Sequence, residues 1–140
     1  MGIITQLMVE SIPTGKKRCE YPATLITDNA TLIPDLMPSN VASLLAIVTE
    51  TRFDESVVPI LYTAPNEDAW LFRIPDEIVG YMDKANAKEL KGLARKWRKV
   101  DPTIKLHYDL AAMDMLFNKI KEFSTLSIQA RKPLLVRVML

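Results

Sequence analysis

The chain has 140 residues, of which 49% are hydrophobic and 25% are charged, and its formal net charge at pH 7 is +1. This size and composition predict one folded domain, residues 1–140, and exclude an intrinsically disordered chain, because enough apolar surface is available for a core. The near-neutral net charge also excludes a protein that binds polyanions through its overall charge.

The charge is unevenly distributed along the chain. Residues 1–83 carry 5 basic and 12 acidic side chains, a net charge of −7, whereas residues 84–140 carry 13 basic and 5 acidic ones, a net charge of +8. Such asymmetry bears on surfaces and partners rather than on the fold.

The first predicted elements are strands. Residues 3–9 are apolar and fit a strand or the first turns of a helix, of which we favour the strand. The Pro, Gly and charged residues of 12–22 predict a loop. Two similar segments, ATLIT and ATLIP, then flank Asp28 and Asn29. Because Asp and Asn tolerate the positive φ of tight turns, this pattern predicts a β-hairpin.

A helix is predicted for residues 38–50. Ser39 or Asn40 is suited to cap its first backbone N–H groups, and apolar residues recur at the helical spacing. These residues are Val41, Leu44, Leu45 and Val48. Residues 56–64 are β-branched and apolar, but Pro59 lacks the N–H that a central strand donates, so an edge strand or an irregular segment is expected.

The segment DAWLFRIPDEIVGYM predicts a strand that leads into a helix. Its residues alternate as in a half-buried strand. Trp70, Phe72 and Ile74 share one face, and Leu71 and Arg73 share the other. Pro75 suits the first helical position, and Asp76 and Glu77 suit the positive N-terminal end of a helix.

Two more helices and a final strand are predicted. Asn86 and Glu89 form an Asn variant of the capping box, and Pro102 marks the end of the helix that they begin. A third helix is expected over residues 110–130, with Asp109 as its N-cap. Its buried stripe is Met113, Leu116, Phe117, Ile120, Phe123 and Ser127. The terminal PLLVRVML is so apolar that we expect it inside a sheet.

These elements predict one α+β domain with a small mixed sheet and a helical block between the Trp70 strand and the C-terminal strand. The strand ending in RIPD, the helix with Lys, Arg and Trp, and the terminal KPLLVRVML resemble a bacterial family of small uncharacterised proteins. In that family a leucine-rich final strand follows a long helix. The resemblance covers roughly residues 69–140, and this chain departs from it in having Arg137 where the family's last strand carries a tryptophan. The resemblance implies this fold and no known activity.

The most basic stretch, ARKWRKVDPTIKLHYD at residues 94–109, interleaves cationic and aromatic residues. A helical wheel separates the two kinds. One side carries Leu90, Leu93, Ala94, Trp97 and Val100. The opposite side carries the set that we call the basic ridge: Lys88, Lys91, Arg95, Arg98 and Lys99. Because Trp97 falls on the apolar side, we do not expect it to stack on nucleobases.

Three interpretations of the basic ridge stay open. It is a solvated helix face, a surface for an acidic protein, or a set of phosphate contacts whose binding would depend on salt. The predicted helices 76–84 and 87–99 also invite comparison with a helix-turn-helix, but the turn at Asn86 lacks a glycine and the ridge has few residues that read bases. Because short αα-hairpins are common for packing reasons alone, a simple αα-hairpin is the favoured interpretation.

No catalytic or metal-binding motif is evident. His107 lies between Asp101 and Asp109, and a neighbouring carboxylate could orient a histidine as a general base. No serine or cysteine nucleophile stands at a recognisable motif, however, so we interpret His107 as structural. The acidic pairs lack the spacing of a calcium loop. They are Asp54-Glu55, Glu67-Asp68 and Asp76-Glu77. P-loop, GxGxxG and GxSxG motifs are absent from the sequence, so no cofactor is expected.

The expected location is the cytoplasm. Residues 1–10 have no basic leader, Gln6 stands where myristoylation requires Ser or Thr, and the longest apolar run, 41–48, is too short to span a bilayer. Cys19 is the only cysteine, which fits a reducing compartment.

We therefore predict a non-enzymatic protein that binds an acidic protein partner, or associates with itself, through the basic ridge. Trp70 or Tyr81 would anchor the contact if exposed. The alternatives are a nucleic-acid-binding module that uses the same ridge and an enzyme centred on His107. No membrane association is expected.

Overall fold

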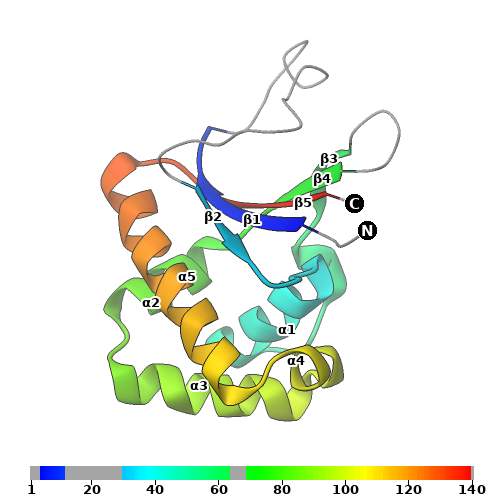
Figure 1. Cartoon of the computed structure of the whole chain (residues 1–140), viewed down its shortest axis with the longest axis vertical. Helices are drawn as coiled ribbons and strands as arrows, with labels where there is room; N and C mark the ends of the chain where they lie inside the picture. The colour runs from blue at the N-terminus through cyan, green and yellow to red at the C-terminus, as the bar shows by residue number, and fades with distance from the viewer. Residues whose placement is uncertain (1–3, 12–29, 64–68, 140) are drawn as a thin grey trace.

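The computed structural model describes residues 4–11, 30–63 and 69–139. Within these ranges the chain forms five strands, five α-helices and one short 3-10 helix (Figure 1). In chain order they are β1 (Ile4–Val9), β2 (Ala30–Ile33), α1 (Pro38–Thr49), η2 (Glu55–Val57), β3 (Ile60–Thr63), β4 (Ala69–Arg73), α2 (Asp76–Lys84), α3 (Ala87–Val100), α4 (Pro102–His107), α5 (Leu110–Ala130) and β5 (Leu134–Met139).

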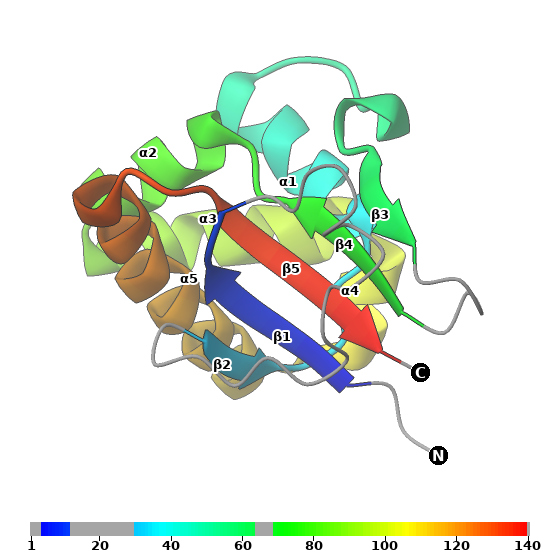
Figure 2. The same cartoon turned by 90° about the horizontal axis from the view of Figure 1, so that it is seen from above.

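The strands form one sheet in the order β2-β1-β5-β4-β3, and the α-helices cover one of its faces (Figures 1 and 2). The α+β class and the helical block between β4 and β5 are confirmed. The expectation of a mixed sheet is wrong, because every described strand pair is antiparallel. β3 lies at the sheet edge, as Pro59 predicted.

The C-terminal strand β5 lies at the centre of the sheet, between β1 and β4. Leu134, Val136 and Val138 belong to the main core, on the side of the helices. Leu135 belongs to a second, smaller cluster with Met8 and Leu71. Because both faces of β5 are buried, its sequence is apolar at nearly every position, as expected for a strand inside a sheet.

Local sequence signals placed most helix ends correctly. α5 spans the predicted residues, and the Asp109 carboxylate accepts a hydrogen bond from the Ala112 backbone N–H at 2.7 Å. Asn86 and Glu89 form the predicted reciprocal capping box. Pro75, however, is the N-cap of α2 rather than its first residue.

Two other expectations differ from the structure. The N-cap of α1 is Met37, and Asn40 Oδ1 reaches back to accept the Met37 N–H at 2.9 Å. The short helix α4 was not predicted. Of the expected hairpin, the second segment forms β2, while the first segment and its turn lie outside the described residues, as do Cys19 and the pair Glu67-Asp68.

The main core lies between the sheet and the helices, and Trp97 is its largest fully buried side chain. The Trp97 ring stacks on Phe117 of α5, with the ring centroids 5.7 Å apart and an interplanar angle of 1°. All six residues of the predicted α5 stripe are buried. Tyr108 is also buried; its hydroxyl donates to the Asp35 carbonyl at 2.8 Å, and burial raises the pKa of Tyr108.

The Lys121 side chain of α5 caps the C-terminal end of α2. Its ammonium donates to three backbone carbonyls: Met82 at 3.0 Å, Asp83 at 2.9 Å and Ala85 at 2.8 Å. The last carbonyls of a helix have no partner within the helix, so a cation here satisfies groups that are otherwise unpaired and complements the helix dipole. Lys121 is therefore a structural cation and not part of a binding surface.

Replacing Lys121 with Met is expected to lower the free energy of unfolding by about 2 kcal/mol, because the half-buried carbonyls lose a charged donor. Urea unfolding followed by circular dichroism measures the change. Lys119→Met is the matched control on the same helix: Lys119 makes one exposed bond, to the Leu32 carbonyl at 2.7 Å, and its loss should cost about 0.5 kcal/mol. Equal losses in the two variants would contradict the capping role of Lys121.

Candidate functional site

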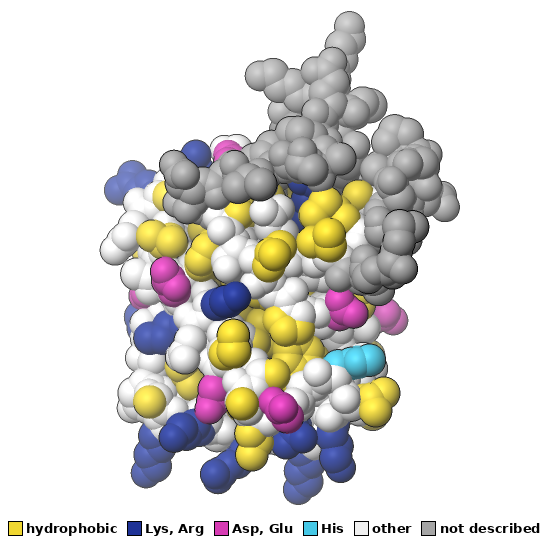
Figure 3. Space-filling model, viewed as in Figure 1, with side chains coloured by type: hydrophobic (Ala, Val, Ile, Leu, Met, Phe, Trp, Pro, Cys, Tyr) yellow, Lys and Arg dark blue, Asp and Glu magenta, His cyan; other side chains and the backbone are white. Residues whose placement is uncertain are grey.

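The basic ridge lies at the end of the molecule farthest from the sheet. α3 forms this end, and Lys and Arg side chains gather along it (Figures 1 and 3). Leu90, Leu93, Ala94 and Trp97 face inward and are buried. Of the predicted ridge residues, four are exposed to solvent: Lys88, Lys91, Arg95 and Lys99. The amphipathic pattern of the sequence therefore describes α3 correctly.

Two residues of α3 differ from the helical-wheel expectation. Arg98 is half-buried, and its Nε donates to the Tyr108 backbone carbonyl at 3.1 Å, so Arg98 holds the start of α5 against α3. Val100 was expected on the buried side but is 57% exposed. Val100 is the last residue of α3, and the chain turns there into α4, so the core beneath the helix ends at Trp97.

The positive charge of the ridge is not neutralised by ion pairs in the described part of the chain. The two salt bridges found there join Arg73 to Asp76 and Lys132 to Glu10, far from α3 in the sequence. Glu89 is the only acidic residue of α3, and its carboxylate caps the helix. The ridge is therefore a surface of uncompensated cations on a rigid helix, which suits it to an anionic partner.

A buried hydrogen-bond network fixes the C-terminal end of α3 against α1. Asp101 Oδ1 accepts the backbone N–H groups of Thr103 at 3.1 Å and Ile104 at 3.2 Å, which caps α4. Asp101 Oδ2 accepts hydrogen bonds from Asn40 Nδ2 at 3.1 Å and from the Ser43 hydroxyl at 2.7 Å. The indole N–H of Trp97 in turn donates to Ser43 Oγ at 2.9 Å. Three helices, α1, α3 and α4, thus meet at one carboxylate.

A pocket of about 500 Å³ opens beside this network, and we call it the α1–α3 pocket. Its apolar lining comprises Ala46, Ile47, Phe53, Val100 and Pro102. Phe53, like Val100, is 57% exposed, so two large apolar side chains face solvent at this one pocket. The polar lining residues Asn40, Ser43 and Asp101 are buried and bonded to one another, so they shape the pocket without offering free charge.

A second hollow, of about 310 Å³, lies farther along α3. It is lined by Tyr81, Glu89 and Lys96, and also by Glu50. Burial and the Glu89 carboxylate raise the pKa of Tyr81. Tyr81 and Trp70 are both half-buried and pack against the main core, so neither is the exposed anchor that the sequence analysis considered.

No family model, curated protein or solved structure matches this chain. The resemblance of residues 69–140 to a bacterial family of small proteins therefore stays a prediction.

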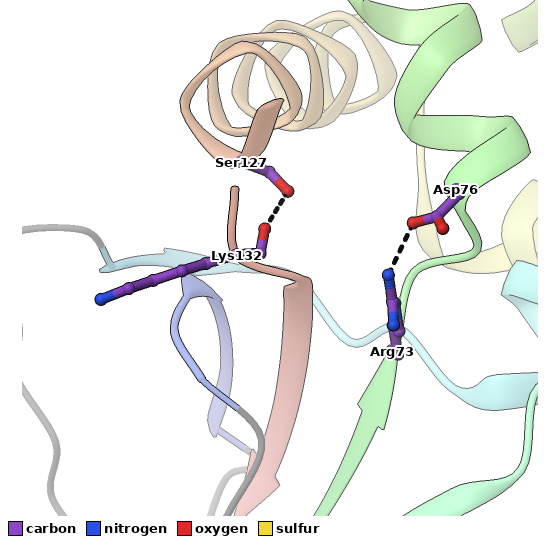
Figure 4. Close-up of polar contacts among 4 residues, drawn as sticks. All are labelled: Arg73, Asp76, Ser127 and Lys132. Atoms are coloured by element: carbon purple, nitrogen blue, oxygen red, sulfur yellow. Dashed lines mark hydrogen bonds and ion pairs between the residues drawn. The ribbon is translucent and has the colours of Figure 1, made fainter. Parts of the chain in front are cut away.

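A third hollow, of about 490 Å³, has basic residues on its lining but does not bring them together. Arg73 pairs with Asp76 at 2.7 Å, and the Lys132 side chain points away from that pair (Figure 4). The Ser127 hydroxyl donates to the Lys132 carbonyl and is not available to a ligand. An anion would meet no convergent set of donors here.

The remaining candidates give no catalytic or metal site in the described residues. His107 is exposed at the end of α4, and Asp101 and Asp109 use their carboxylates to cap helices rather than to bond with His107. No group of three or more His, Cys, Asp or Glu side chains is placed to hold a metal ion in the part of the chain that is described. None of the described helices has both the length and the apolar composition needed to cross a bilayer.

Sequence reasoning found the ridge but missed the pocket beside it. Phe53 and Asn40 are distant from Asp101 in sequence, and no motif links them. One local signal could have predicted α4. An aspartate followed by a proline, as in Asp101-Pro102, is a typical N-cap and first residue of a helix.

Proposed function

We propose that this protein binds an acidic protein partner through the basic ridge. The observation that carries the proposal is the row of exposed cations Lys88, Lys91, Arg95 and Lys99 on one face of α3, without ion pairs to other described residues. A rigid helix that presents such a row steers and orients a partner of opposite charge. We place this binding in the cytoplasm, because a single cysteine fits a reducing compartment.

Protein binding is favoured over nucleic-acid binding because of what the ridge lacks. Trp97 and Tyr108, the aromatic residues of the basic stretch, are both buried, with Trp97 stacked on Phe117. Sequence-tolerant binding of single strands relies on exposed aromatic rings on which bases stack. The exposed ridge has only lysine and arginine side chains, which suffice for charge complementarity with an acidic surface.

Reversing two charges of the ridge tests this proposal. The double substitution Arg95→Glu with Lys99→Glu is expected to weaken partner capture at least about tenfold, because like charges would then face each other across the contact. The tagged wild type and the variant are used to capture proteins from the host lysate, in nuclease-treated and untreated halves, and the captured proteins are quantified. Those lost with the variant should be acidic and should also elute with rising salt.

A matched control reverses two cations at the other end of the molecule. Arg131→Glu with Lys132→Glu changes the net charge equally but lies at the C-terminal end of α5, far from α3 (Figure 1). It should leave capture unchanged. Equal loss in both variants, or in neither, would contradict the proposal. Capture that disappears with nuclease would favour nucleic acid, and a concentration-dependent mass in analytical ultracentrifugation that the ridge variant abolishes would favour self-association.

A further inference from the structure

We propose that the acidic partner inserts an apolar side chain into the α1–α3 pocket and places its acidic residues against Lys96 and Lys99. This inference rests on the proposed function and deepens it, because it names the chemistry of the bound segment: one large apolar anchor with carboxylates on one side. The contact is thereby placed at the C-terminal end of α3 rather than along the whole ridge.

The pocket has the features of an anchor site. Five of its lining residues are apolar, and two of these, Phe53 and Val100, keep 57% of their surface exposed. The volume of about 500 Å³ is ample for one large side chain. Hot spots of protein interfaces are typically such preformed pockets filled by an aromatic or aliphatic residue.

The floor of the pocket is held rigid. Asp101 receives bonds from two backbone N–H groups and from Asn40, and Ser43 links it to the Trp97 indole. Because these bonds tie α1, α3 and α4 together, the pocket does not have to be formed when a ligand arrives. A preformed site loses less conformational entropy on binding than a site that must be ordered.

The charges around the pocket determine which partner fits. Lys96 and Val100 are four residues apart on α3 and are therefore neighbours on its surface. Lys96 and Lys99 do not line the pocket themselves but lie on the last turn of α3, which ends at Val100. Asp101 is the only acidic side chain among the described lining residues, and it is buried and fully bonded. A carboxylate beside the anchor thus meets cations on the α3 side. Lys96 also lines the smaller hollow along α3, where Glu50 and Glu89 accompany it, so a carboxylate placed in that hollow would meet acidic side chains as well.

Selection from a displayed library of random 12-residue peptides on the immobilised full chain tests the inference. The enriched peptides should share a Phe, Leu, Met or Trp with at least two Asp or Glu residues to one side of it. A synthetic, fluorescently labelled copy of the most enriched peptide then serves as the probe, and its dissociation constant is measured by anisotropy. Failure to enrich such peptides would overturn the inference.

Four variants of the protein test where the peptide probe binds. Phe53→Ser and the pair Lys96→Glu with Lys99→Glu should each weaken it about tenfold or more, since the anchor loses its wall or the carboxylates lose their cations. Leu106→Ser, at an apolar residue that is 80% exposed on α4 outside the pocket, should leave it unchanged. Lys88→Glu with Lys91→Glu makes the same charge change about 12 Å away along α3 and should have a much smaller effect.

The outcomes separate this inference from the proposed function. If both charge-reversal pairs weaken the probe equally and Phe53→Ser does not, the inference is overturned while binding through the ridge stands. If neither pair has an effect, the inference is overturned, and the capture experiment with Arg95→Glu and Lys99→Glu decides whether the proposed function stands. The replaced Phe53, Lys96 and Lys99 side chains are all exposed, so circular dichroism and thermal unfolding should confirm that the variants keep the fold.

Discussion

Replacement of Trp97 by alanine is expected to lower the free energy of unfolding by about 3–5 kcal/mol, a large part of the stability of a domain of this size. Trp97 is completely buried, stacks on Phe117 and donates its indole N–H to Ser43. The substitution would leave a cavity beneath α3 and remove a donor from the network around Asp101. Denaturant unfolding monitored by far-ultraviolet circular dichroism measures the loss.

The variant Trp97→Phe separates the two contributions. Phenylalanine keeps an aromatic ring to pack on Phe117 but lacks the N–H, so we expect a smaller loss, about 1–2 kcal/mol. The double variant Trp97→Phe with Ser43→Ala should then cost less than the sum of the two single changes, because both remove the same bond. A loss below about 1 kcal/mol for Trp97→Ala would mean that Trp97 does not hold the core as the structure indicates.

Replacement of Asp101 by alanine is expected to lower the free energy of unfolding by about 3 kcal/mol. The carboxylate caps α4 through the N–H groups of Thr103 and Ile104 and also accepts from Asn40 and Ser43. Without it these buried donors lose their acceptor, which costs more than the loss of an ordinary helix cap. Because the network forms the floor of the α1–α3 pocket, the variant should also bind the peptide probe more weakly.

Asp109→Ala is the matched control for this change. Asp109 is also an N-cap aspartate, but it is exposed and accepts one bond, from the Ala112 N–H. Its loss should cost about 1 kcal/mol and leave the pocket intact. If the two alanine variants lose the same stability, Asp101 is only a helix cap and its bonds to α1 contribute nothing measurable.

Helix positions followed from the sequence because their signals are local. A cap, its N–H partner and the apolar stripe lie within a few residues of one another, as at Asn86 and Glu89 or along α5. The errors are equally local in origin. Val100 continues the apolar spacing of α3, yet the helix ends there, and Asn40 bonds back to Met37 from the third helical position rather than from the cap.

The strand arrangement was less accessible. The apolar C-terminal segment indicated a buried strand, but its neighbours are β1, near the N-terminus, and β4, in the middle of the chain. Strand direction depends on how the helical block returns the chain to the sheet, and no local pattern of residues encodes that path. The sequence therefore led us to expect a mixed sheet, whereas β5 pairs antiparallel with both β1 and β4.

For the candidate site, the sequence by itself determined the basic ridge, because a helix with a period of 3.6 residues fixes which side chains share a face. Tertiary structure decided the rest. It showed that Arg98 is bound to the Tyr108 carbonyl, that Val100 is exposed, and that Phe53 and Val100 line one pocket with Asp101. Those facts depend on contacts between residues tens of positions apart, and such contacts arise from packing of whole elements rather than from the preferences of any short segment.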